Sequence, residues 1–130
     1  MIVVLDTNVW ISALEFGGVP DGALVKALGD DQLAISGYIR DEILRVLKTK
    51  FRRDSSMSRK RLDELLMRAI VVEVTGEISG ACRDSKDDAI LETAWKAHAD
   101  YLVAGDKYLL ALKEFRGIAI ITPATYLRLT

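Results

Sequence analysis

The chain has 130 residues, with 18 Lys and Arg against 19 Asp and Glu, so its formal net charge is -1. Half of the residues are hydrophobic, and with 9 Gly and 2 Pro the composition excludes collagen-like and intrinsically disordered chains. This length predicts one domain spanning residues 1–130. The single cysteine, Cys82, excludes an internal disulfide and a thiolate metal site.

Two further features of the sequence bear on location and partners. The N-terminus enters an apolar stretch without basic residues, and no apolar run approaches the ~20 residues that cross a bilayer. We therefore expect a cytoplasmic protein with no membrane contact. Residues 40–68 contain ten basic and five acidic residues, so a basic middle lies between acidic flanks.

Short apolar runs alternate with segments of helical periodicity along the chain. Strands are predicted at residues 2–5, 33–35, 70–74, 101–104 and 118–121, and helices over 22–28, 38–51, 58–68, 87–98, 106–113 and 124–129. Glu73 makes the third strand an edge strand. The alternation predicts an α/β fold, a three-layer α/β/α sandwich with a mainly parallel sheet of four or five strands.

Acidic residues gather where such a sheet binds its ligands, at the carboxyl ends of the strands. Asp6 directly follows the first strand, and Asp106 closely follows the fourth. Glu42 lies on the apolar stripe of its helix, where an unsatisfied carboxylate costs several kcal/mol. Asp87 and Asp88 open the predicted helix over residues 87–98 and lean toward its buried side.

Each of these residues also has a purely structural interpretation. Asp6 and Asp106 are suited to capping a helix or closing an Asx turn, and Asp87 and Asp88 to a helix N-terminus. A buried arginine partner would explain Glu42.

Together, however, four separate segments send carboxylates to one sheet edge. Two unit charges ~5 Å apart repel by about 3 kcal/mol at an effective dielectric constant of ~20. Protons or a cation must compensate this repulsion, and oxygen ligands alone favour Mg²⁺ or Mn²⁺. Such a site is suited to hydrolysis of phosphodiester bonds.

Three segments resemble the motifs of PIN-domain ribonucleases, in the order in which that family has them. They are residues 4–14 (VLDTNVWISAL), 83–92 (RDSKDDAILE) and 99–107 (ADYLVAGDK), and the subgroup most resembled is the VapC-like toxins of bacterial and archaeal toxin–antitoxin pairs. Ala104 departs from the pattern, because many relatives have Thr or Ser there.

The resemblance implies a metal-dependent endoribonuclease with Mg²⁺ or Mn²⁺ as cofactor, an RNA substrate, a cognate antitoxin protein and a homodimeric state. It implies that the catalytic, metal-binding residues are Asp6, Glu42, Asp88 and Asp106, with Asn8, Ser12, Asp84 and Asp87 as supporting polar residues. Which of Asp84, Asp87 and Asp88 is the metal-binding residue of this segment is left open. The family's sheet order places the first strand centrally, beside the fourth.

The basic segment offers candidates for RNA contact, namely Lys48, Lys50, Arg52 and Arg53, although a solvated helical hairpin explains them equally well. Cys82, His98, Trp10 and Trp95 are interpreted as structural residues. Other functions remain open. A haloacid-dehalogenase-like phosphatase would need a second Asp where Asn8 stands, and a receiver module would need an Asp at the end of its third strand. A PIN fold that binds RNA or protein without cutting is the main alternative.

Overall fold

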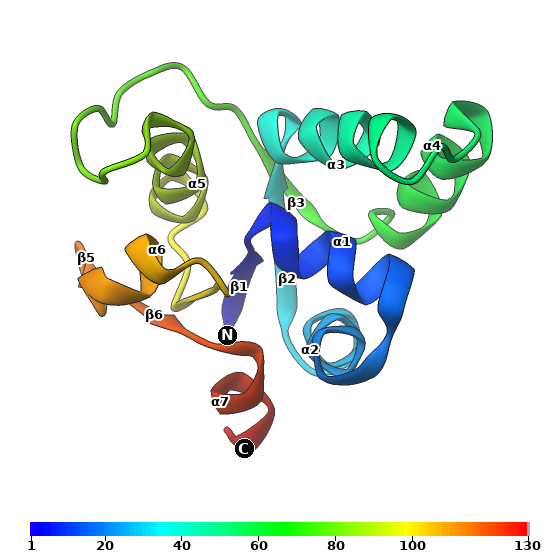
Figure 1. The fold of residues 1–130 in the computed structure, drawn as a ribbon. Coiled ribbons are helices and arrows are strands. Elements are labelled where there is room, and N and C mark those ends of the chain that lie inside the picture. Colours follow the sequence, from blue (N-terminus) through cyan, green and yellow to red (C-terminus); the bar gives the residue numbers. More distant parts are fainter. Residues whose placement is uncertain (130) are drawn as a thin grey trace.

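A computed structural model describes residues 1–129, which form six strands and seven helices (Figure 1). The strands are β1 Ile2–Leu5, β2 Gln32–Ser36, β3 Ile70–Val72, β4 Tyr101–Val103, β5 Glu114–Phe115 and β6 Ile118–Ile121. The helices are α1 Thr7–Phe16, α2 Gly18–Gly29, α3 Gly37–Thr49, α4 Ser55–Leu65, α5 Ser85–Lys96, α6 Lys107–Leu112 and α7 Pro123–Arg128.

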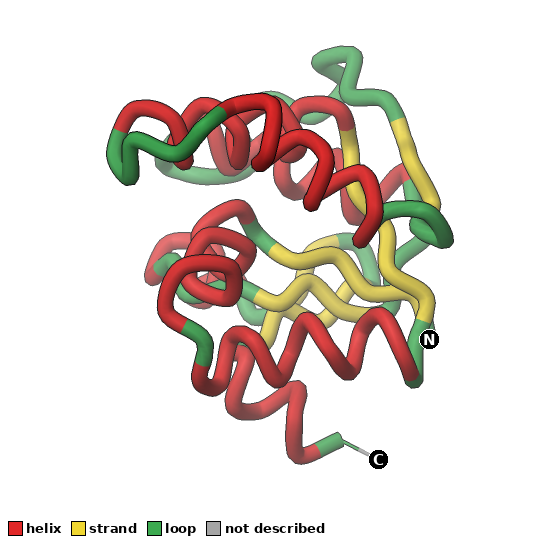
Figure 2. The backbone as a smooth tube through the Cα atoms, turned by 90° about the vertical axis from the view of Figure 1, so that its right-hand side faces the viewer, coloured by secondary structure: helices red, strands yellow, loops and turns green. Residues whose placement is uncertain are grey.

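The strands lie together between the helices (Figure 2). They form one sheet in the order β3-β2-β1-β4-β6-β5. All neighbours are parallel except β5, which pairs with β6 in the antiparallel direction. The predicted α/β fold is confirmed, as are the edge position of β3 and the central position of β1 beside β4. The prediction lacked β5, whose two residues are too few to show a pattern, and the helix α1.

Helices cover both faces of the sheet. Figure 1 shows α1 to α4 on one side of the strands and α5 with α6 on the other. The chain adds β2 and β3 on one side of β1 and then crosses to add β4 and β6 on the other. The winding direction therefore switches between β1 and β4, and this is the position where open α/β sheets form a crevice at the carboxyl ends of their strands.

The core explains why the central strands are continuous apolar runs. Val3, Val4 and Leu5 of β1 are fully buried, as are Leu102 and Val103 of β4, because helices lie over both faces. Trp10 is also fully buried, which confirms its structural interpretation, and Trp95 packs partly buried against the core.

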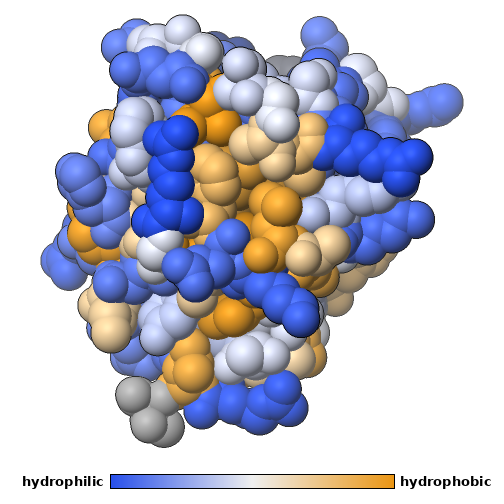
Figure 3. All heavy atoms as spheres, turned by 90° about the vertical axis from the view of Figure 1, so that its left-hand side faces the viewer, coloured by the Kyte–Doolittle hydropathy of each residue, from blue (hydrophilic) through white to orange (hydrophobic). Residues whose placement is uncertain are grey.

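The face on the side of α5, α6 and β5 mixes apolar groups with charged side chains (Figure 3). In the turn that follows β5, the Arg116 guanidinium lies 4.8 Å from the ring centroid of Trp95 and 5.2 Å from that of Phe115. Such stacking covers aromatic surface with a cation that stays hydrated at its edge. None of the helices formed by residues 1–129 is long and apolar enough to cross a membrane.

Candidate active site

A pocket of about 220 Å³ lies at the switch point, between the start of α1, one face of α3 and the start of α5. Five carboxylates from four separate parts of the chain reach it, together with three cationic side chains. The lining residues are Asp6, Thr7, Asn8, Glu42, Arg45, Val46, Lys50, Asp84, Lys86, Asp87, Ile90 and Asp106. Three of the four predicted catalytic residues, Asp6, Glu42 and Asp106, are therefore brought together.

Asp6 lies at the centre of this arrangement, between two strands. Its backbone N–H donates to the Val103 carbonyl at 2.9 Å, which joins the end of β1 to the end of β4. Asp6 occupies the N-cap position of α1, but its side chain makes no capping hydrogen bond. Only 4% of the residue is exposed, and within residues 1–129 neither its Oδ2 atom nor Thr7 Oγ1 has a hydrogen-bond partner. A buried carboxylate oxygen left unpaired is available to a ligand.

The pKa of Asp6 is raised by its burial and by the charges of its neighbours. Burial is the largest cause that raises its pKa from 3.8 to about 7, followed by the negative charges of Asp87 and Asp106. Glu42 adds a smaller contribution in the same direction, and the backbone N–H of Thr7 opposes it. Ionising Asp6 at neutral pH therefore costs free energy in the folded protein, and a bound cation would lower this cost.

Asp106 combines a capping role with a place in the pocket. It is the N-cap of α6, where its Oδ1 atom accepts hydrogen bonds from Tyr108 N at 2.7 Å and Leu109 N at 3.0 Å. The structural interpretation of this residue is thus correct, yet it does not exclude a second role. A carboxylate has two oxygens, and capping through Oδ1 holds the group in a fixed orientation at the pocket wall.

Asp87 and Asp88 differ sharply, although both are 7% exposed. Asp87 lines the pocket, whereas the carboxylate of Asp88 accepts hydrogen bonds at 3.0 Å from the backbone N–H groups of Gly80, Ala81 and Cys82. The structure therefore does not bring Asp88 to the other carboxylates as predicted, because the loop before α5 uses both of its oxygens. Asp87 takes that place.

Asp87 is held close to other charges of the pocket. Burial, then the charge of Asp106 and then that of Asp84, raise its pKa from 3.8 to about 6. The Cys82 thiol donates to Asp87 Oδ2 at 3.7 Å and opposes this shift. Asp84 is exposed, caps α5 by accepting from Lys86 N at 3.0 Å, and also lines the pocket.

Two buried carboxylates one turn apart on α5 hold the loop that precedes it. Glu92 is fully buried and accepts from Thr75 N at 2.6 Å and Ile78 N at 3.1 Å, with Lys96 Nζ 3.4 Å away. Asp88 binds the next part of the same loop, at residues 80–82. Sequence reasoning missed Glu92, although its position four residues after Asp88 on a buried helical face was a usable signal.

Glu42 reaches the pocket from α3, whose start is fixed by hydrogen bonds. Ser36 Oγ caps α3 by accepting from Ile39 N at 3.2 Å, and it also accepts from Thr93 Oγ1 of α5 at 2.8 Å. Within the described range, Glu42 makes no ion pair within 4 Å, so the buried-arginine explanation does not hold.

The basic residues around the pocket are only partly those predicted. Lys50 lines it, whereas Lys48, Arg52 and Arg53 lie outside, and Arg53 Nε pairs with Glu15 Oε1 at 2.8 Å. Arg45 and Lys86 line it although neither was predicted. Their spacing was a signal, since Arg45 lies one helical turn after Glu42 and Lys86 adjoins Asp87.

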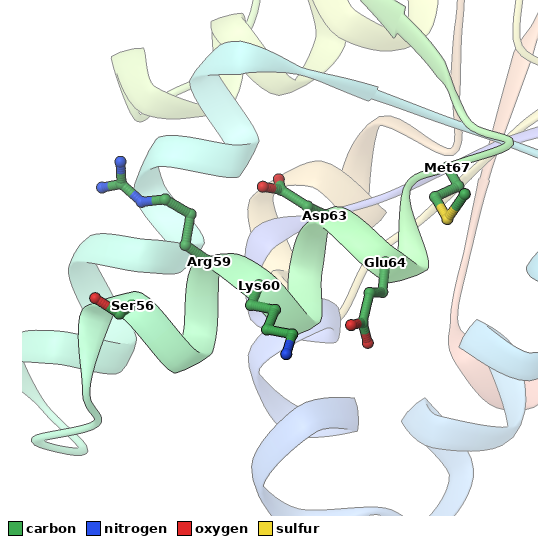
Figure 4. Close-up of a pocket in the computed structure, with 6 residues that line it drawn as sticks. All are labelled: Ser56, Arg59, Lys60, Asp63, Glu64 and Met67. Atoms are coloured by element: carbon green, nitrogen blue, oxygen red, sulfur yellow. The ribbon is translucent and has the colours of Figure 1, made fainter.

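Of the supporting residues, Asn8 lines the pocket and Ser12 lies outside it. A separate hollow on α4 shows why the remaining basic segment is a poor track for a polyanion. It is lined by Ser56, Arg59, Lys60, Asp63, Glu64 and Met67, so each of the two cations has a carboxylate one helical turn further on (Figure 4).

The carboxylates of the pocket are the type of ligand that a hard divalent cation binds, but they do not form a preformed metal site. Within residues 1–129, no group of three or more His, Cys, Asp and Glu side chains already has the geometry to hold a metal ion. Mg²⁺ commonly binds through one or two carboxylates and keeps several waters, which such an open pocket accommodates. The unpaired oxygen of Asp6 and the mutual repulsion around it both favour this kind of ligand.

Comparisons with known proteins agree with this fold. The structure of VapBC2 from Rickettsia felis bound to a DNA fragment from their promoter contains a chain 18% identical, with a TM-score of 0.66, over 92% of this chain and 97% of that one. Mycobacterium tuberculosis VapC20, a sarcin-ricin loop cleaving toxin, is 13% identical, with a TM-score of 0.62, over 90% of this chain and 98% of that one. At these identities the likeness shows the fold alone. A comparison with curated proteins gives no match.

The sequence itself matches a family model described as PIN domain over residues 2–108. This match covers the first strand, the candidate carboxylates and Asp106, and it sets aside the phosphatase and receiver alternatives. The chain belongs to the PIN domain family.

Proposed function

We propose that this protein is a metal-dependent endoribonuclease whose metal-binding and catalytic carboxylates are Asp6, Glu42, Asp87 and Asp106. The observation that carries the proposal is the convergence of these side chains on a buried Asp6 whose Oδ2 atom is unpaired and whose pKa is raised to about 7 by burial and by the charges of the other three. Asp87 stands here in place of the predicted Asp88, whose oxygens bind the loop.

The cofactor that suits this site is Mg²⁺ or Mn²⁺, which when bound lowers the pKa of a water and stabilises negative charge on a phosphate. The chain's own residues hold and orient this ion. Asp106 is fixed by its cap on α6, and Asp6 by the backbone bond between β1 and β4. Asp84 and Asn8 serve as polar residues at the rim, while Arg45, Lys50 and Lys86 offset the negative charge that would otherwise repel RNA.

We propose further that the protein acts as the toxin of a toxin–antitoxin pair, with a cognate antitoxin protein and a homodimeric state. Support comes from the two solved structures of the same fold, of which one is a VapBC2 complex and the other a toxin that cleaves the sarcin-ricin loop. Co-purification of the tagged protein with the product of the neighbouring reading frame tests the partner, and light scattering of the isolated protein tests the dimer.

The nuclease proposal is tested by incubating purified protein with RNA in Mn²⁺, in Mg²⁺ and in excess EDTA. Cleavage should require the ion and should fall by about a hundredfold or more in Asp6→Asn, equivalent to about 3 kcal/mol at ~1.4 kcal/mol per decade. Cleavage that persists in EDTA, or an Asp6→Asn variant as fast as the wild type, would refute it.

A PIN fold that binds RNA or protein without cutting is the second candidate. The observation that favours it is the set of exposed cations at the pocket, Arg45, Lys50 and Lys86, which can attract a polyanion whether or not an ion is bound. Binding of RNA without any metal-dependent cleavage would select this alternative.

A further inference from the structure

A second pocket, of about 380 Å³, adjoins the acidic pocket along α3. It is lined by Tyr38, Asp41, Glu42, Arg45 and Lys86. Glu42, Arg45 and Lys86 line both pockets, so the two share a wall. A linear molecule held in the acidic pocket can therefore continue into the second one.

One face of α3 presents an aromatic ring, a carboxylate and a cation in sequence. Tyr38, Glu42 and Arg45 are spaced four and three residues apart, which places them on the same side of the helix. Tyr38 lies in the first turn and is 36% exposed. In the part of the chain that the structure describes, no other aromatic ring or cation is stacked on it. Its ring therefore has no stacking partner, while burial and then the neighbouring Glu42 raise the pKa of its hydroxyl.

The two cations of this pocket are also free to bind a ligand. Arg45 and Lys86 are exposed and line a pocket that contains several carboxylates. Yet neither makes an ion pair within 4 Å to any residue among 1–129. Because a guanidinium and an ammonium group are the usual partners of phosphate oxygens, both are available to a nucleic-acid backbone.

We propose that this second pocket binds one unpaired nucleotide of an RNA substrate, with its base stacked on Tyr38 and the adjoining phosphates held by Arg45 and Lys86. The inference rests on the proposed nuclease function and adds to it a binding site for one nucleotide next to the carboxylates. The volume lies near the lower end of the roughly 300–1,000 Å³ typical of ligand pockets, which suits a single nucleotide. A base can offer its face to an aromatic ring only when it is unstacked, so this pocket accepts a nucleotide of a single strand or a loop and not one within a duplex.

The test compares Tyr38→Ala, Tyr38→Phe and the wild type on a labelled single-stranded oligoribonucleotide and on a duplex of equal length. Binding is measured by fluorescence anisotropy in EDTA, and KM and kcat are measured in Mn²⁺. The matched control is Phe16→Ala, which removes an aromatic ring that is 74% exposed and lies outside both pockets. Arg45→Gln and Lys86→Gln are compared with Arg59→Gln and Lys60→Gln on α4.

Tyr38→Ala should weaken single-strand binding and raise KM by about tenfold or more, with kcat within about twofold, while Tyr38→Phe stays near the wild type. Arg45→Gln and Lys86→Gln should each lower the slope of log K against log salt by about 0.7, and the α4 controls should not. Duplex binding should be weaker than single-strand binding and should not respond to Tyr38→Ala.

Two results would overturn the nucleotide pocket: unchanged single-strand binding in Tyr38→Ala, or an equal loss in Tyr38→Phe. If the wild type cleaves RNA but Tyr38→Ala has an unchanged KM, the pocket is rejected and the nuclease stands. If the wild type binds single strands through Tyr38 but never cleaves, the pocket is supported and the nuclease is rejected.

Discussion

Asp87 and Asp88 are consecutive residues with equal burial, yet their carboxylates belong to different parts of the molecule. Asp87 lines the acidic pocket beside Asp6 and Asp106, whereas Asp88 accepts three backbone hydrogen bonds from residues 80–82. Successive residues of an α-helix point about 100° apart, so a carboxylate pair at a helix start divides between two environments. One carboxylate can thus serve the pocket while the other holds the loop beside it.

This division predicts opposite effects for two matched substitutions. Asp88→Asn should lower the free energy of unfolding by about 2 kcal/mol or more, because its amide cannot accept three N–H groups as a carboxylate does. Amide hydrogen exchange at residues 80–82 should become faster. Asp87→Asn should leave the unfolding free energy unchanged or higher and should lower metal-dependent cleavage by about a hundredfold or more. If instead Asp88→Asn abolishes cleavage at full stability while Asp87→Asn remains active, Asp88 is the metal ligand.

Removing the charge of Asp6 should separate stability from function. The pKa of Asp6 is raised by burial and by neighbouring carboxylates, so Asp6→Asn keeps the shape and relieves the repulsion. We expect a higher Tm than the wild type without metal. Mn²⁺ should raise the Tm of the wild type by mass action and that of the variant much less. An equal Mn²⁺ effect in both proteins would show that the ion binds elsewhere.

Stability without metal should fall as pH rises from about 5 to 8. The pKa values of Asp6 and Asp87 are raised from 3.8 to about 7 and about 6, so the folded state binds more protons than the unfolded state in this range. The stability that protonation contributes is fully present below pH 3.8 and is lost as pH passes through 6 and 7. Thermal melts at intervals of half a pH unit measure this slope, and Asp6→Asn should flatten it.

Metal binding should show the reverse dependence on pH. An ion binds the ionised carboxylates and must displace their protons, so the Mn²⁺-induced rise in Tm should be larger at pH 8 than at pH 6. Cleavage should increase over the same range. A Mn²⁺ effect independent of pH would contradict the assignment of Asp6 and Asp87 to the metal.

Among the basic residues predicted from the sequence, only the one that lines the acidic pocket should contribute to RNA binding. Lys50→Ala should lower the salt dependence of RNA binding by about 0.7 in slope, since Lys50 lines the acidic pocket. Arg53→Ala should leave this slope unchanged and cost at most about 1 kcal/mol of stability, because its partner is Glu15 on α1. Equal slopes in the wild type and in Lys50→Ala would assign Lys50 to solubility or to a protein interface.

Local patterns were sufficient for much of the fold. Apolar runs at the five longer strands and helical periods between them predicted the α/β class. A strand buried on both faces is a continuous apolar run, whereas a helix buried along one side repeats apolar residues every three to four positions. The position of Asp6 after β1 and of Asp106 after β4 predicted that both reach one crevice, since parallel strands end at the same edge. The two-residue β5 is too short to leave such a spacing.

The tertiary structure decided which side chains share the pocket. Asp88 and Glu92 could be assigned to the loop 75–82 only once that irregular segment was placed beside α5, because its backbone N–H groups have no sequence signature. Arg45 and Lys86 meet at the pocket although they lie on different helices. Their meeting depends on how α3 and α5 pack across the sheet, and packing of distant segments is a property that no local pattern contains.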